Sequence, residues 1–166
     1  EIHIPAAFSK LFKSDCDWAY HTEPQAGLNG RKLFWPRGKT LGGSSSINAM
    51  IYIRGHARDY DHWETLGNSG WGYRDVLPFF KKSEHQERGP SEFHGVGGPL
   101  NGADLRTVNP TAQAFVEAGA EIGLARNSDF NGAQQEGVGL YQVTQKNGRR
   151  HSTAAGFLKP ALKRPN

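Results

Sequence analysis

A glycine- and serine-rich stretch that leads directly into an apolar run constrains this chain more than any other feature. The stretch extends from Arg37 to Ala49, and the apolar run Met50 to Ile53 follows it. Small residues before a buried segment indicate backbone that passes close to a ligand. A tight loop in front of an ordinary core element would have the same composition. Composition alone leaves both interpretations open.

The stretch does not match the common phosphate-binding loops. Gly38-Lys39-Thr40 is like the end of a Walker loop, but that pattern requires Gly five residues before Gly38, where Leu33 stands. The pairs in Gly95-Val96-Gly97 and Gly137-Val138-Gly139 lack the third Gly of a dinucleotide fingerprint. This chain therefore cannot hold a pyrophosphate in the usual Rossmann manner.

Nucleophilic and metal chemistry are also disfavoured. Ser44 to Ser46 lack the Gly-x-Ser-x-Gly elbow, so hydrogen bonds from their hydroxyls to a ligand or to the loop explain them better. Four residues on or just before a predicted helix could gather a metal, namely His56, Asp59, Asp61 and His62. No closed ligand set is evident among them, so we interpret them as the exposed side of that helix.

Hydrophobic spacing predicts four helices. They extend over Asp59 to Leu66, Tyr73 to Glu84, Pro110 to Ile122, and from Ser152 toward Pro160. In the second, Pro78 must lie near the first turn or bend the helix, because it has no N–H to donate.

The third helix has the clearest signals. Asn109 is the expected N-cap and Pro110 the first helical residue. Its predicted apolar face consists of Ala112, Phe115, Val116, Gly119 and Ile122. Loops and short strands are expected from 87 to 109, and a strand around Val138 to Thr144.

Composition predicts a small core. Hydrophobic residues make up 36% of the chain, and 21 Gly and 9 Pro break it into turns and loops. Such a chain usually gains support from a cofactor, a partner or the rest of a larger protein. The net charge of +4 is scattered rather than grouped, which argues against nucleic acid as a partner.

The ends and the cysteine count bear on location. The chain has no initiator Met and stops at Asn166 just after a predicted helix, so we expect an internal piece of a longer protein. A single Cys16 excludes an internal disulfide and fits a reducing compartment. No apolar run reaches the ~20 residues of a membrane span. We predict a cytoplasmic location and leave membrane association of the full-length protein open.

The stretch from Arg37 to Ala49, with Asp59-Tyr60-Asp61 and Trp63 beyond it, resembles the first signature of the glucose-methanol-choline (GMC) oxidoreductases. The similarity continues through Trp18-Ala19-Tyr20, through Asp75 to Lys82, and from Gly148 to Asn166. It therefore covers nearly the whole chain and is nearest to the choline-dehydrogenase-like branch.

The resemblance implies an FAD site on this stretch. In the family the Gly-Gly-Ser-Ser segment passes the flavin closely, which would explain Gly42 and Gly43 because a Cβ would displace the backbone. The cofactor-binding residues that it implies are Trp18, Arg37, Gly42, Gly43, Ser44, Asn48, Ala49, Met50 and Ile51. Where some relatives carry a His bonded to the flavin, this chain has Ile47, so noncovalent FAD is expected.

The resemblance also implies what these residues lack. The amino-terminal Gly-x-Gly-x-x-Gly unit and the carboxy-terminal catalytic His with its partner are absent, so no catalytic residue is assigned. We expect an α/β protein, mixed α+β within this piece, comprising part of an FAD-binding domain and a portion of the substrate domain. Residues 87 to 132 could belong partly to the substrate side, and the sequence does not fix the boundary between the two domains.

The implied activity is oxidation of an alcohol, choline or another primary alcohol, by hydride transfer to flavin. Two alternatives remain at this level. A hydroxynitrile-lyase-like enzyme shares the fold and keeps FAD, and a noncatalytic binding module would result if the piece exists by itself.

Overall fold

A computed structural model describes residues 1–165 and divides them into two compact units. The first consists of residues 1–50 with the segment from Gln145 onward, and the second is Ile51–Thr144. The stretch from 87 to 132 lies wholly inside the second unit.

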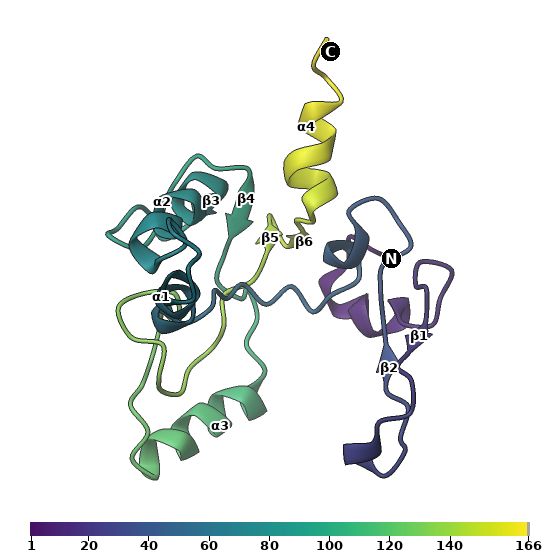
Figure 1. The fold of residues 1–166 in the computed structure, drawn as a ribbon, viewed down its shortest axis with the longest axis horizontal. Helices are drawn as coiled ribbons and strands as arrows, with labels where there is room; N and C mark the ends of the chain where they lie inside the picture. Colours follow the sequence, from purple (N-terminus) through teal and green to yellow (C-terminus); the bar gives the residue numbers. More distant parts are fainter. Residues whose placement is uncertain (166) are drawn as a thin grey trace. The chain divides into compact units, whose positions relative to one another are not determined.

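The first unit consists of short elements joined by turns. Strands β1 (Tyr20–His21) and β2 (Phe34–Trp35) pair antiparallel, as do β5 (Gln145–Lys146) and β6 (Arg149–Arg150) (Figure 1). The remaining elements are helical: η1 (Pro5–Leu11), η2 (Ala26–Leu28), η3 (Gly43–Ser46), the π-helix η4 (Ala154–Leu158) and α4 (Lys159–Ala161). The predicted C-terminal helix is thus confirmed, and its first part is a π-helix.

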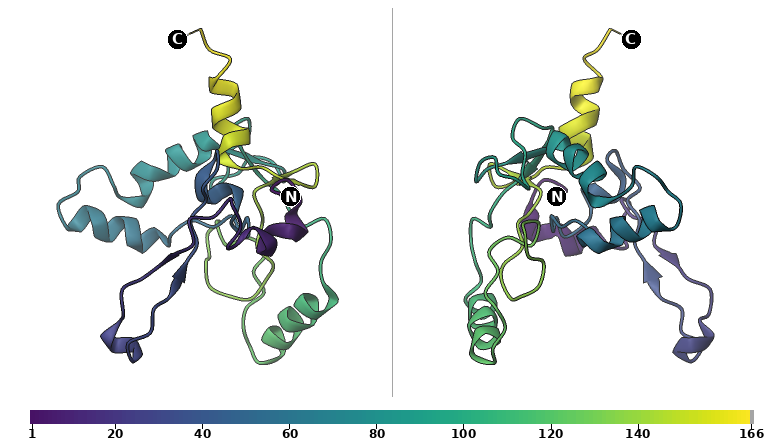
Figure 2. Two further views of the ribbon diagram at one scale, coloured as in Figure 1. Left: turned by 90° about the vertical axis from the view of Figure 1, so that its right-hand side faces the viewer. Right: turned by 60° about the vertical axis from the view of Figure 1, so that its left-hand side comes forward.

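The second unit contains three longer helices and one parallel strand pair. Helices α1 (Ala57–Thr65) and α2 (Tyr73–Ser83) pack against each other (Figure 2), and β3 (Glu84–Gln86) pairs parallel with β4 (Leu100–Gly102). Helix α3 (Pro110–Glu121) follows, with the Asn109 side chain accepting a hydrogen bond from the N–H of Thr111 at 2.8 Å. All three helices were predicted, and the N-cap and Pro110 at N1 are confirmed.

Pro78, expected near the first turn of its helix or at a bend, lies inside α2, in its second turn. Two other details of the predictions were wrong. On α3 only Val116 and Gly119 are buried, whereas Phe115 and Ile122 are 73% and 81% exposed. Residues 138–144 form isolated bridges at Val138 and Val143 instead of a strand, because the loop from Ala125 to Asn127 takes the hydrogen bonds of Val138.

The apolar core is small, as composition predicted. The buried hydrophobic residues are Leu11, Ile47 and Met50 in the first unit and Ala103, Val116, Val138 and Val143 in the second. Coarsely, the chain is the mixture of helices and small sheets that was expected. Among residues 1–165, no helix combines the length and apolarity needed to cross a bilayer.

A buried ionic network organises the second unit. Glu84 is fully buried and accepts hydrogen bonds from Arg54 Nη2 at 3.0 Å and the Gly95 N–H at 2.9 Å. His94 lies between two carboxylates, with Nδ1 2.9 Å from Glu84 Oε1 and Nε2 2.9 Å from Asp129 Oδ2. Both ring nitrogens can donate only in the imidazolium form, so the hydrogen bond to Glu84 chiefly raises the pKa of His94.

Candidate functional site

The Arg37–Ala49 stretch is here called the Gly-Ser loop. Its glycines Gly42 and Gly43 differ in the space that surrounds them. A Cβ on Gly42, whose φ is +89°, would lie 2.5 Å from Ser46 Oγ and 3.0 Å from the Ala154 Cβ. Gly43 also has positive φ, +53°, but a Cβ there would meet no atom within 4 Å. Packing within the chain therefore accounts for Gly42, whereas Gly43 opens onto free space.

Burial divides the loop and the residues after it into two sides. Ser46, Ile47 and Met50 are buried, each 3% exposed or less. Ser44, Asn48, Ala49 and Ile51 are exposed. The second group consists of predicted cofactor residues. Of the residues predicted there, Met50 alone faces inward.

A strained residue follows the loop. Met50 adopts φ +63°, a left-handed conformation that non-glycine residues rarely take, and its N–H donates to Asn48 Oδ1 at 3.0 Å. The same oxygen accepts from Arg150 Nη1 at 2.8 Å. The Asn48 side chain therefore stabilises the turn that places Met50 inward and Ala49 outward.

The segment after β6 clamps the Gly-Ser loop at a second point. The Thr153 N–H donates to Ser45 Oγ at 2.9 Å, and Ser45 Oγ donates to the Gly42 carbonyl at 2.6 Å. Thr153 Oγ1 also donates to that carbonyl at 3.2 Å. More than 100 residues separate Thr153 from Ser45 and Gly42 in sequence, so a distant part of the chain holds the loop.

Trp18 lies just before β1 and Arg37 just after β2, so both lie at the same end of the β1–β2 pair. Trp18 is half exposed, and its ring stacks on Tyr20 with centroids 6.0 Å apart and an interplanar angle of 3°. The ammonium of Lys39 lies 4.8 Å from the same ring. Arg37 is exposed and stacks on Trp35. The Trp18 N–H donates to the Arg37 carbonyl at 2.8 Å, which joins the two predicted residues.

Asp17 fixes this region. Its carboxylate accepts from the N–H groups of Lys13, Ala19 and Arg37 at 2.8–3.0 Å. Burial works toward a higher pKa for Asp17, but the three backbone donors outweigh it and lower the pKa overall. The carboxylate also compensates positive φ at two of its donors, Lys13 and Ala19.

Two of the four candidate metal residues, His56 and Asp59, form the N-terminal cap of α1. The N–H of His56 donates to Asp59 Oδ2 at 2.8 Å, and His56 Nδ1 accepts from the Arg58 N–H at 3.1 Å. Asp61 accepts from the Tyr73 N–H at 2.9 Å. In the part of the chain that the structure describes, no group of three or more His, Cys, Asp or Glu could hold a metal ion.

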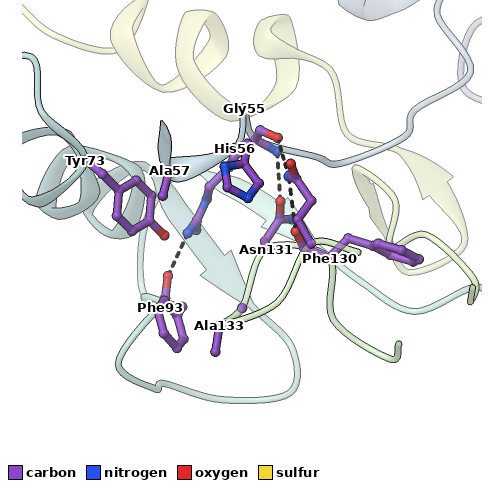
Figure 3. A pocket seen from close by; sticks show the side chains of 11 residues that line it. Gly55, His56, Ala57, Tyr73, Phe93, Phe130, Asn131 and Ala133 are labelled. Atoms are coloured by element: carbon purple, nitrogen blue, oxygen red, sulfur yellow. Dashed lines mark hydrogen bonds between the residues drawn. The ribbon is translucent and has the colours of Figure 1, made fainter. Parts of the chain in front are cut away.

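A pocket of about 190 Å³ lies in the second unit, and none of the predicted cofactor-binding residues lines it. Tyr73, Phe93 and Asn131 line it (Figure 3). The Asn131 side chain accepts a hydrogen bond from the Arg54 N–H and donates one to the Tyr52 carbonyl. Its volume is below the roughly 300–1,000 Å³ of typical ligand pockets, so it is too small for a dinucleotide.

The family model of the GMC oxidoreductases matches residues 9–166, and the chain belongs to this family. The first signature that suggested it, the Gly-Ser loop, is the segment clamped by Arg150 and Thr153.

Among curated relatives, the alcohol dehydrogenase [acceptor] of Pseudomonas putida is 53% identical over 167 residues. The oxygen-dependent choline dehydrogenase of Brucella anthropi is 52% identical over 166 residues. Each match covers 99% of this chain and 30% of the relative. The chain thus spans about a third of the length of the curated relatives it matches.

Solved structures agree on the fold. Pyridoxine 4-oxidase from Mesorbium loti superposes with a TM-score of 0.91 at 40% identity, over 98% of this chain and 32% of that one. An FAD-dependent oxidoreductase from Chaetomium thermophilum gives a TM-score of 0.81 at 30% identity, over 91% of this chain and 28% of that one. The helices and small sheets described above are therefore a piece of the GMC oxidoreductase fold.

Two contributors to the loop were not predicted, Arg150 and Thr153, whereas the hydrogen bond from the Ser45 hydroxyl to the loop agrees with the expectation for Ser44 to Ser46. Arg150 lies in a segment that carried the family resemblance, but sequence offered no sign of its partner. Its contact with Asn48 spans 102 positions, and only the folded chain reveals it. Asp17 was missed because a lone acidic residue before Trp18 carries no pattern.

Proposed function

We propose that this chain forms part of the FAD site of an alcohol-oxidising flavoenzyme, and that it lies in the amino-terminal FAD-binding region of a longer protein. The single observation that carries the proposal is the exposure of Ser44, Asn48 and Ala49 together with the free space at Gly43. In this reading the first unit belongs to an α/β FAD-binding domain, and part of the second belongs to the substrate domain.

The donor set fits a flavin. Asn48 Nδ2 makes no hydrogen bond in the described part of the chain, Ser44 carries an exposed hydroxyl, and Gly43 leaves room for a flat ring to approach the backbone. Trp18 and Arg37 would contribute an aromatic face and a positive charge. Gly42 and Met50 would act through their backbone, because packing within the chain uses their side-chain positions.

FAD, when bound, would supply the acceptor for the hydride that leaves the alcohol carbon. The loop would hold the ring in place and direct hydrogen-bond donors at positions where negative charge develops. Ile47 is 2% exposed and has no nucleophilic atom, so the cofactor would be bound noncovalently. The relatives' names support an alcohol as substrate, either choline or another primary alcohol.

A matched pair of glycine substitutions in the full-length protein tests the proposal. Gly43 and Gly30 both have positive φ, +53° and +72°, and both have open space where a Cβ would lie. Backbone strain is therefore comparable in Gly43→Ala and Gly30→Ala, and only the first would crowd a ligand on the loop. We expect a lower ratio of FAD to protein after desalting in Gly43→Ala alone. Equal ratios in the two variants would contradict a flavin contact at Gly43.

A further inference from the structure

The Asn48 carboxamide has only one possible orientation. Its oxygen accepts from two donors, Arg150 Nη1 at 2.8 Å and the Met50 N–H at 3.0 Å. An NH₂ group in that place would face two donors, so the assignment of oxygen and nitrogen follows from the hydrogen bonds. The amide nitrogen is left on the exposed side, without a hydrogen bond to the described residues. Asn48 can therefore offer a ligand donors only.

The buried Arg150 side chain stabilises this orientation of the Asn48 carboxamide. It is 3% exposed, and besides Asn48 it donates from Nε to the Ile2 carbonyl at 2.9 Å and from Nη1 to the Ser45 carbonyl at 3.1 Å. These bonds fix the guanidinium against the Gly-Ser loop and leave it little freedom to rotate.

The charge of Arg150 is not compensated within the described chain. It takes part in no ion pair with a carboxylate of residues 1–165, and its buried Nη2 has no hydrogen-bond partner there. Burial accordingly lowers the pKa of its guanidinium. A buried cation without a counter-charge is costly, and a negative charge nearby would relieve that cost.

The geometry points to Arg150 as a positioning residue. By bonding the Asn48 oxygen, it leaves the Asn48 NH₂ group exposed as a donor, and it places a positive charge on the buried side of that carboxamide. This inference rests on the proposed flavin site. The ligand group that suits such a donor is a ring carbonyl or ring nitrogen that gains negative charge when the cofactor is reduced. Arg150 would then favour the reduced form of FAD over the oxidised form, although it does not touch the substrate.

The prediction is a shift in reduction potential. In the full-length holoenzyme, Arg150→Met should lower the midpoint potential of bound FAD, with a shift of about tenfold in the reduction equilibrium, or ~30 mV for a two-electron couple. Arg150→Lys keeps the charge and should restore part of the shift. Arg149→Met is the matched control, because Arg149 is the exposed neighbour with the same charge, and its potential should equal that of wild type.

Asn48→Asp provides a test that does not depend on Arg150. The aspartate can still accept from Arg150 and Met50, but it replaces the outward donor by a carboxylate oxygen, so the potential should fall further. In the double variant, Arg150→Met should add less than it does alone, because both changes act through one hydrogen-bonded unit. If Arg150→Met does not fold, the fall in Asn48→Asp still supports the inference, and an unchanged potential there overturns it.

The outcomes separate this inference from the proposed function. Wild-type protein that binds no FAD would overturn both. FAD bound with the same potential in wild type, Arg150→Met and Asn48→Asp would overturn the positioning role alone. A lower melting temperature in Arg150→Met with an unchanged potential would show that Arg150 has a purely structural role.

Discussion

Glu84→Gln should strongly destabilise the second unit. The carboxylate is fully buried, and it accepts from Arg54, His94 and the Gly95 N–H at 2.9–3.0 Å. Glutamine keeps the shape but removes the charge, and its NH₂ must face at least one of these donors. Removing one partner of a buried ionic network typically costs about 3–5 kcal/mol, because it leaves uncompensated charge in the interior.

Urea unfolding of the protein, followed by tryptophan fluorescence, measures this loss. Trp63 and Trp71 report on the second unit, where they contact each other with ring centroids 6.0 Å apart. With an m-value of about 2 kcal/mol/M, the midpoint should fall by roughly 1.5–2.5 M. Glu117→Gln is the control, since it breaks the exposed pair with Arg126 and should leave the midpoint unchanged. A loss below about 1 kcal/mol in Glu84→Gln would refute the assignment of a tightly coupled buried network.

Three further predictions follow from local contacts. Because the pKa of His94 is raised in the fold, its contribution is complete below its ordinary value of about 6.5 and is lost as pH rises through the raised value. The destabilisation caused by His94→Gln should therefore shrink from pH ~6 to pH ~9 in urea unfolding, and growth over that range would contradict the imidazolium assignment. Gly119→Ala should lower the melting temperature despite its better helix propensity, since the new Cβ would lie 2.9 Å from Val138 Cγ2, and a rise would show that Val138 can move away. Acid precipitation of the full-length protein should leave flavin fluorescence in the supernatant because of Ile47, whereas flavin on the polypeptide would disprove noncovalent binding.

Local signals were sufficient to predict the helices. Asn109 followed by Pro110 predicted the start of α3 because capping and a fixed proline φ act over a few residues. The buried face of α3 was predicted less well, since Phe115 and Ile122 are largely exposed among residues 1–165. The prediction of a strand at 138–144 was wrong for a related reason. Val138 pairs with Arg126 in an isolated bridge, and no local pattern in the sequence indicates this partner.

The residues of the candidate site stay a prediction, and the contacts that hold its loop were missed. The Gly-Ser loop could be recognised as a contiguous motif, and the structure leaves Ser44, Asn48 and Ala49 exposed. Its clamps at Arg150 and Thr153 come from more than 100 residues away, where no periodicity or spacing connects them to the loop. Gly42 shows the limit of motif reasoning, because its Cβ is excluded by Ser46 and Ala154 within the chain.

Anaerobic reduction of the flavin by an alcohol tests the central claim most directly. The full-length protein is desalted, its visible flavin absorbance is recorded, and primary alcohols including choline are added without oxygen. We predict a flavin spectrum before addition and bleaching of the visible band by at least one alcohol, with the aldehyde as product. A protein that carries no flavin, or whose flavin band no alcohol bleaches although dithionite does, would contradict an alcohol-oxidising flavoenzyme.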